Sequence, residues 1–196
     1  ISPASRILVA GDAADSMSKQ TGGWTITWQG TDNRNSDFPG ATTVLDGLSQ
    51  AVDQSGGSVM YSEDGDYDVR PDVAIVVFGE EPYAEFQGDL DSTEFEPVFK
   101  KSLQILKRLK AEEIPVVSVF FSGRPMWVNP ELNLSDAFVA AWLPGSEGAS
   151  IADVLIADSE GNPRFDFTGT LSFSWPKEPR QGTQNPHHAN YDPLFP

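Results

Sequence analysis

One apolar run near the middle of the sequence constrains the fold more than any other feature. Residues 73–78 read Val-Ala-Ile-Val-Val-Phe without a polar interruption. A strand with one face in water alternates apolar and polar residues, so an uninterrupted, β-branched run indicates a strand that is buried on both faces. Such strands belong to parallel sheets that helices cover on both sides. The run therefore predicts an α/β protein.

Strand and helix patterns alternate along the rest of the chain. Apolar runs predict strands over residues 7–10, 59–61, 116–121 and 137–142, and residues 170–175 are expected to form a sixth strand at the sheet edge. Helical spacing of apolar residues predicts helices over residues 42–52, 95–111 and 146–156, with Val98 on the apolar stripe of the second. Thr42 or Thr43 and Ser146 are the expected caps. The predicted fold is a three-layer α/β/α sandwich around a six-stranded, mostly parallel sheet.

The length of 196 residues suits one domain of this kind. We expect residues 1–176 to form the sandwich and residues 177–196, which are rich in Pro, Asn and His, to form an irregular tail. The chain begins at Ile1 without a Met and stops abruptly at Pro196. The native chain is therefore expected to continue beyond both ends.

Composition excludes several function classes. With a net charge of −16, the surface is expected to repel nucleic acid and anionic lipid, whereas neutral substrates such as sugars remain possible. The sequence has no cysteine, which excludes thiol catalysis, disulfides and thiolate metal sites. No run of eighteen apolar residues predicts a transmembrane helix. No motif indicates a cofactor.

The loop after residues 73–78 is the first candidate site. It carries Glu80, Glu81, Glu85 and Asp89 beside aromatic residues, and ligands of parallel α/β sheets bind beyond the carboxyl ends of strands. Carboxylates that transfer protons, next to aromatic faces that stack on pyranose rings, suit sugar chemistry. On composition alone, a solvated acidic loop is the commoner explanation.

A second candidate segment holds two tryptophans four residues apart. Trp24 and Trp28 stand between glycines in the sequence Gly-Gly-Trp-Thr-Ile-Thr-Trp-Gln-Gly of residues 22–30. They could line the aromatic wall of a binding cleft. They could equally be core residues or part of a contact between domains.

Weaker motifs point to other chemistries. The segment after residues 7–10 lacks the G-x-G-x-x-G pattern of a dinucleotide loop. Alternating aspartates at 64, 66 and 68 resemble the start of a calcium loop, but Val69 replaces its glycine and Ile75 its bidentate glutamate. The adjacent histidines at 187 and 188 lack a matching ligand cluster, so no metal site is predicted. Arg124 is expected to form a structural salt bridge with a nearby acid.

Several segments, in this order, resemble the second domain of glycoside hydrolase family 3. They are Ile-Leu-Val-Ala-Gly at 7–11, Gly-Gly-Trp-Thr at 22–25, Trp-Gln-Gly at 28–30, Ala-Ile-Val-Val-Phe-Gly-Glu at 74–80, Pro-Tyr-Ala-Glu at 82–85, Ser-Gly-Arg-Pro at 122–125, Ala-Ala-Trp-Leu-Pro-Gly-Ser-Glu-Gly at 140–148 and Tyr-Asp-Pro-Leu-Phe at 191–195. The resemblance spans nearly the whole chain. Within the family it is greatest to exo-β-glucan glucohydrolases and exo-1,3/1,4-β-glucanases.

The resemblance implies a function. The chain would be the second domain of a retaining exo-β-glucosidase or β-glucanase that releases glucose from the non-reducing end of β-glucans. Glu85 would be the general acid/base, and an N-terminal barrel domain would supply the aspartate nucleophile. Trp28 would wall the outer glucose subsite, and Trp24, also substrate-binding, would lie near the same entrance. Glu80 or Glu81 could share the role of Glu85. Family members are commonly secreted or periplasmic, and the chain alone is expected to be inactive.

Two other classes stay open at this point. A non-catalytic carbohydrate-binding or scaffolding domain would need the tryptophans but not Glu85. A nucleotide- or flavin-binding sheet is disfavoured by the missing glycine loop and the acidic charge.

Overall fold

The computed structural model of the chain describes residues 1–53 and 55–196. Its centre is a sheet of parallel strands in the order β2-β1-β3-β4-β5. The strands are β1 (Arg6–Ala10), β2 (Ser58–Ser62), β3 (Val73–Gly79), β4 (Val116–Phe121) and β5 (Ala137–Trp142). The central strand β3 is buried along its whole length, as its apolar sequence predicts. The α/β fold with a parallel sheet is thereby confirmed.

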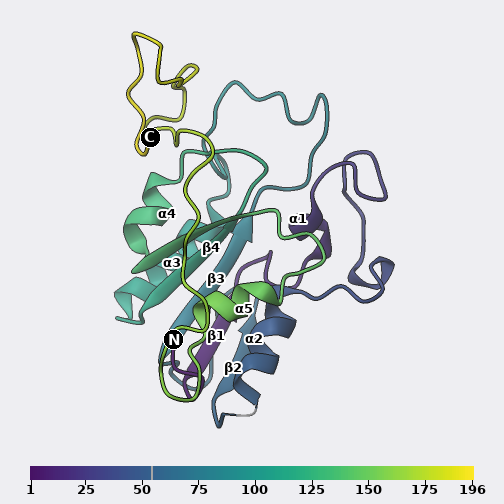
Figure 1. Cartoon of the computed structure of the whole chain (residues 1–196), viewed down its shortest axis with the longest axis vertical. Helices are drawn as coiled ribbons and strands as arrows, with labels where there is room; N and C mark the ends of the chain where they lie inside the picture. Colours follow the sequence, from purple (N-terminus) through teal and green to yellow (C-terminus); the bar gives the residue numbers. More distant parts are fainter. Residues whose placement is uncertain (54) are drawn as a thin grey trace.

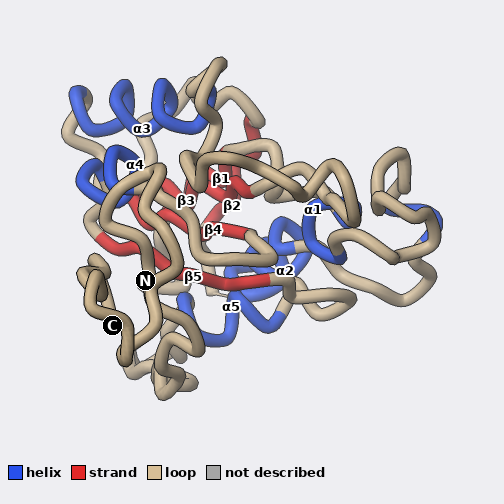
Figure 2. Tube along the Cα trace, turned by 90° about the horizontal axis from the view of Figure 1, so that it is seen from above, coloured by secondary structure: helices blue, strands red, loops and turns tan. Residues whose placement is uncertain are grey.

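Helices cover both faces of this sheet (Figure 2). One side carries α2 (Val44–Asp53) and α5 (Ser150–Leu155), and the other carries α3 (Lys101–Ala111) and α4 (Asn129–Leu134). Successive residues of β3 point to opposite faces. Ile75 and Val77 therefore pack in the core under α2 and α5, while Val76 and Phe78 pack in the core under α3.

The predicted sixth strand is wrong, because the structure has five strands in its described residues. Residues 170–175 have the alternating pattern of a strand, but Trp175 turns inward and is buried against the sheet. Its backbone N–H donates to the carbonyl of Phe195 and its carbonyl accepts from Leu194 N–H, both at 2.8 Å. The backbone N–H and carbonyl of Trp175 are therefore paired with Phe195 and Leu194 of the tail, and they do not pair with β5 as in a sixth strand.

Two helix boundaries also differ from prediction. The helix predicted from residue 95 begins only at Lys101, because Pro97 interrupts the pattern and Lys100 has a left-handed φ of 52°. Val98 is consequently exposed rather than part of an apolar stripe. Thr43 is confirmed as a cap, since its hydroxyl accepts from Asp46 N–H. Ser146 is not a cap, because α5 begins at Ser150.

Two short helices were not predicted at all. They are α1 (Met17–Thr21) and α4. The first begins after Ser16, whose hydroxyl accepts from Lys19 N–H, and it leads into the segment that carries the two tryptophans. A 3₁₀ turn at Asn35–Asp37 follows that segment.

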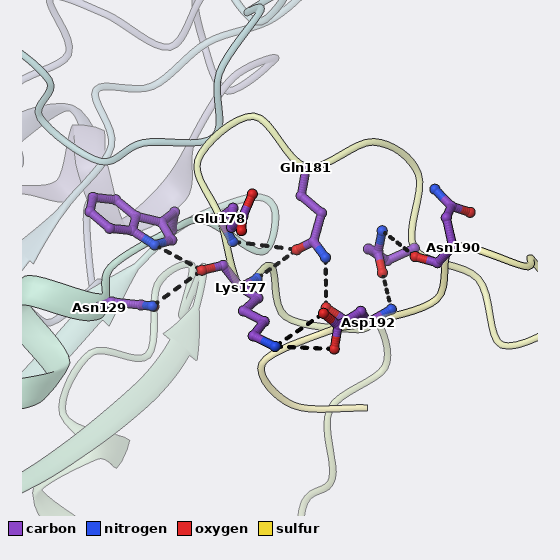
Figure 3. A network of polar contacts seen from close by, with 8 residues as sticks. Asn129, Lys177, Glu178, Gln181, Asn190 and Asp192 are labelled. Carbon is purple, nitrogen blue, oxygen red and sulfur yellow. Dashed lines mark hydrogen bonds and ion pairs between the residues drawn. The ribbon is translucent and has the colours of Figure 1, made fainter.

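Residues 177–196 contain no helix or strand, but polar contacts hold them together (Figure 3). The Gln181 side chain accepts from Lys177 N–H at 2.7 Å and donates to the Asp192 carbonyl at 2.6 Å. Lys177 Nζ also pairs with the Asp192 carboxylate. Figure 1 shows this yellow segment beyond one end of the sheet, on the same side as the teal loop that follows β3.

No helix in the described part of the chain is long and apolar enough to cross a membrane.

Candidate active site

The two candidate segments meet beyond the carboxyl ends of the central strands. Residues 22–30 follow β1 and α1, and residues 80–89 follow β3. Since β1 and β3 are parallel neighbours, both segments leave the sheet at the same edge. This edge is where the strand direction predicts a ligand site.

Gly23 allows the two segments to touch through their backbones. A Cβ atom at Gly23 would lie 1.9 Å from the Tyr83 carbonyl oxygen, so a larger residue would force the segments apart. The turn that follows is tight, because Trp24 N–H donates to the Trp28 carbonyl at 2.9 Å. Trp24 and Ile26 both adopt a left-handed φ, of 58° and 59°. The contact between the loops therefore brings the tryptophan turn beside Glu85.

Glu85 and three aromatic residues form one exposed group, here called the tip cluster: Trp24, Trp28, Glu85 and Phe86. The indole Nε1 of Trp28 donates to Glu85 Oε2 at 2.7 Å. The Trp24 and Trp28 rings are tilted with centroids 6.1 Å apart, and Phe86 meets Trp28 edge-on at 5.9 Å. Trp24 is 69% exposed, Trp28 48% and Phe86 75%. An exposed aromatic patch around a carboxylate is a typical ligand or partner surface.

The carboxyl group of Glu85 is stabilised as an anion in this state. The indole N–H of Trp28 is the main cause, and the backbone N–H of Glu85 adds to it. Together they lower the pKa of Glu85 below its ordinary value, because hydrogen bonds to the charged form favour ionisation. The exposed position contributes little desolvation to oppose this effect.

The other two glutamates of the loop have different surroundings. Glu80 is only 9% exposed and forms a two-pronged ion pair with Arg124, at 2.9 Å from Nε and 2.7 Å from Nη2. Ser122 donates its hydroxyl to the other oxygen of Glu80 at 2.8 Å. Arg124 in turn lies over the ring of Tyr83, 4.2 Å from its centroid. The salt bridge predicted for Arg124 is confirmed, and its partner is Glu80.

Glu81 pairs with Lys19 of α1. Lys19 Nζ lies 2.8 Å from Glu81 and 2.9 Å from Asp12, and it donates to the Gly79 carbonyl at 3.2 Å. Burial disfavours the charge on Lys19, but the two carboxylates outweigh it and raise the pKa of Lys19. We call the Glu80–Arg124 and Lys19–Glu81 pairs the loop base. Of the three glutamates, Glu85 alone combines high exposure with contact to the tryptophans.

The structure thus brings together all three residues singled out from the sequence: Glu85, Trp28 and Trp24. Sequence reasoning missed Phe86, Lys19 and Gln29. The side chain of Gln29 accepts from Ala84 N–H and donates to the Glu85 carbonyl. The only signal for it was its place directly after Trp28.

The remaining polar motifs do not assemble into a site. Asp64 and Asp66 pair with the basic face of α3, through Lys101 and Arg108. Residues 1–53 and 55–196 contain no group of three or more His, Asp or Glu side chains that could hold a metal ion.

Comparison with known proteins bears on this arrangement. The profile of the "Glycosyl hydrolase family 3 C-terminal domain" matches residues 2–196. The crystal structure of exo-1,3/1,4-β-glucanase from a Pseudoalteromonas species superposes with a TM-score of 0.97 at 59% identity, over 100% of this chain and 24% of that one. A β-glucosidase from Listeria innocua in complex with glucose superposes with a TM-score of 0.66 at 25% identity, over 91% of this chain and 24% of that one.

Two curated proteins are similar in sequence. Lysosomal β-glucosidase of Dictyostelium discoideum is 32% identical over 180 residues, which are 83% of this chain and 21% of that protein. Periplasmic β-glucosidase of Salmonella typhimurium is 30% identical over 109 residues, 55% of this chain and 13% of that protein. The chain therefore spans about a quarter or less of the length of these relatives.

Proposed function

The chain belongs to the C-terminal domain family of glycosyl hydrolase family 3, and on that premise we propose that it is the acid/base-bearing domain of a retaining exo-β-glucosidase or β-glucanase. The enzyme releases glucose from the non-reducing end of β-glucans. An N-terminal barrel domain of the same protein supplies the nucleophilic aspartate and most of the glucose site. The similarity to an exo-1,3/1,4-β-glucanase and to two β-glucosidases supports this substrate class.

In this mechanism, Glu85 first protonates the departing glycosidic oxygen while the barrel aspartate attacks the anomeric carbon. Glu85 then accepts a proton from water, which hydrolyses the covalent glycosyl-enzyme. Retention requires the two carboxyl groups to lie about 5–5.5 Å apart. Trp28 and Trp24 stack on the sugar that occupies the outer subsite.

A single observation carries the proposal: the Glu85 carboxylate lies against the exposed Trp28 indole, where a bound sugar could contact both. Glu80 and Glu81 are less suited to the role. Both are engaged in ion pairs, with Arg124 and Lys19, and in the described residues neither has a hydrogen bond to Trp24 or Trp28.

A proton donor must carry its proton near neutral pH, whereas the pKa of Glu85 in the chain alone is below its ordinary value. The barrel domain reverses this shift. It buries the tip cluster and places the nucleophile's negative charge beside Glu85, and both effects raise a carboxyl pKa. The chain alone is therefore inactive as a hydrolase. A periplasmic or secreted location fits the periplasmic relative.

The test is Glu85→Gln in the enzyme that contains the barrel domain. We expect kcat to fall about 100- to 10,000-fold on substrates with poor leaving groups, which is the usual contribution of a general acid/base. Dinitrophenyl glucoside needs no protonation to depart, so its glycosylation step is spared, and azide restores part of its turnover. Asp89→Asn, on the same loop, is the matched control and retains activity. Normal turnover of cellobiose or laminaribiose by Glu85→Gln contradicts the proposal.

The exposed tryptophan pair also favours a second candidate, a carbohydrate-binding domain without catalytic duty. That function predicts glucan binding by the chain alone, lost in Trp28→Ala and unchanged in Glu85→Gln. Full enzyme activity with Glu85→Gln together with such binding would favour this candidate over the hydrolase domain.

A further inference from the structure

We propose that Gln29 is a positioning residue that sets the direction of the Glu85 side chain. This inference rests on the proposed function, since it concerns the aim of the acid/base carboxyl.

The amide group of Gln29 forms two hydrogen bonds with the backbone of the acid-bearing loop. Its Oε1 accepts from Ala84 N–H at 2.6 Å, and its Nε2 donates to the Glu85 carbonyl at 3.0 Å. An amide side chain presents one acceptor and two donors in one plane, so it can pair with a backbone as a neighbouring strand does. The two backbone groups lie on either side of the Glu85 Cα atom. Holding both limits rotation of the backbone at Glu85 and thereby restrains the direction of its Cα–Cβ bond.

These two backbone groups depend on Gln29. In the described residues, neither Ala84 N–H nor the Glu85 carbonyl has another hydrogen-bond partner. Ala84 is itself buried, so an unpaired N–H at that position would cost free energy. The next residue, Phe86, has a left-handed φ of 73°, a backbone geometry that a bulky residue adopts only when its surroundings impose it.

Other contacts hold the loop at different backbone groups. Gly88 N–H donates to the Ala84 carbonyl at 3.0 Å, and Arg124 Nη1 donates to the Gly88 carbonyl at 2.6 Å. These bonds close the turn and join it to the loop base. The first restrains the peptide unit that precedes Glu85, but neither bond engages Ala84 N–H or the Glu85 carbonyl, which only Gln29 holds in the described residues.

Gln29 also couples the acid to the aromatic wall. It is adjacent to Trp28, whose indole holds the Glu85 carboxylate at 2.7 Å. One short segment thus holds Glu85 at the backbone through Gln29 and at the side chain through Trp28. Because proton transfer requires heavy atoms within hydrogen-bond reach, an error of about 1 Å in position can cost up to about 100-fold in rate.

The test uses Gln29→Met, which preserves the length and volume of the side chain but removes both hydrogen bonds. Gln50→Met on the exposed face of α2 is the matched control. In the chain itself, carboxyl-carbon NMR is expected to show the pKa of Glu85 moving up toward its ordinary value in Gln29→Met, since the Trp28 contact is populated less. The Gln50→Met titration is expected to match that of the unaltered chain.

In the enzyme with its barrel domain, Gln29→Met is expected to lower kcat on cellobiose or laminaribiose by about 10- to 100-fold. The glycosylation step with dinitrophenyl glucoside, which needs no acid, should lose far less, and KM should change little. A purely structural role would instead lower turnover of both substrates by the same factor, and that result overturns the proposal. So does an unchanged Glu85 titration in the Gln29→Met chain.

The two proposals fail separately. If Glu85→Gln is fully active while Gln29→Met still releases the Glu85 carboxyl in the NMR titration, the proposed function is wrong and the positioning contact stands. If Glu85→Gln is inactive and Gln29→Met behaves like Gln50→Met, the positioning role is wrong and the proposed function stands.

Discussion

The base and the tip of the loop after β3 lie in opposite environments. At its base, Glu80 and Lys19 are nearly buried, and each carboxylate there has a cationic partner. At its tip, Glu85 is exposed and its side chain is held by the neutral indole N–H of Trp28. The base is thus complete within this chain. In the tip cluster, about half or more of each aromatic side chain is exposed to solvent. This exposure leaves room for a second domain to cover the cluster.

This contrast separates the two ion-paired carboxylates from the one that we propose as the acid/base. The carboxylates of Glu80 and Glu81 are engaged with the cations of Arg124 and Lys19, and these ion pairs join the loop to the layer beneath it. A carboxylate that is held only by a neutral donor can change its protonation state when its surroundings change. The charge of the partner group therefore distinguishes Glu85 from Glu80 and Glu81, which are only five and four residues away.

The largest expected effect lies at the base. Arg124→Met leaves the carboxylate of Glu80 buried without its cation, and we expect the free energy of unfolding to fall by about 3 kcal/mol. Chemical denaturation of the chain measures this loss. Lys177→Met is the control, since its pair with Asp192 is exposed and should contribute less than about 1 kcal/mol. Equal losses of unfolding free energy in Arg124→Met and Lys177→Met would show that the Glu80–Arg124 pair stabilises the fold no more than an exposed surface pair does.

Gly23, where the tryptophan segment touches the loop after β3, should show an intermediate effect on stability. In Gly23→Ala, the added methyl group meets the Tyr83 carbonyl, so we expect a loss of about 1–3 kcal/mol together with loosening of the Trp28–Glu85 contact. Thermal unfolding and the indole N–H signal of Trp28 measure the two consequences. Gly169→Ala is the control, because a Cβ atom there meets nothing within 4 Å. A fully stable Gly23→Ala chain with an unshifted indole signal would contradict the close approach of the two loops.

The smallest effect on stability is expected at the tip. Trp28→Phe removes the main donor to Glu85, so the pKa of Glu85 should rise toward its ordinary value. A lowered pKa stabilises the fold above the ordinary carboxyl pKa, and that contribution disappears as the pH falls through the lowered value. The stability difference between the original chain and Trp28→Phe should therefore narrow in acid. Carboxyl-carbon NMR and unfolding at several pH values check both expectations.

Trp24→Phe provides the graded comparison for that experiment. Trp24 contributes least among the causes that lower the pKa of Glu85, so its replacement should shift the titration less than Trp28→Phe does. The opposite order would show that the indole of Trp28 is not the principal partner of the carboxylate.

The sequence predicted the parts of the fold that burial dictates. The apolar run of β3 could occupy only the centre of a covered sheet, and it does. Residues 170–175 have an equally strand-like pattern, but pattern does not reveal the pairing partner, and Trp175 bonds to the tail instead. The helix start at Lys101 was missed because the stripe was extended across Pro97.

The site was predictable to a similar degree. Glu85, Trp28 and Trp24 could be named from a resemblance in motifs, and the structure brings them together in the tip cluster. Gln29 could not, because its partners are backbone atoms 55 and 56 positions away, and backbone atoms carry no sequence signal. The same limit applies to Lys19, whose partners meet only after the sheet has formed.

The central claim is that Glu85 is an anion in this chain and becomes a proton donor when a barrel domain covers the tip cluster. The direct measurement is the pKa of its carboxyl, taken by selective glutamate labelling with Glu85→Gln as the blank, in the chain alone and in the protein that includes the barrel. We predict a value below the ordinary range of glutamate in the chain alone and above that range in the joined protein. An equally low value in both would contradict the account.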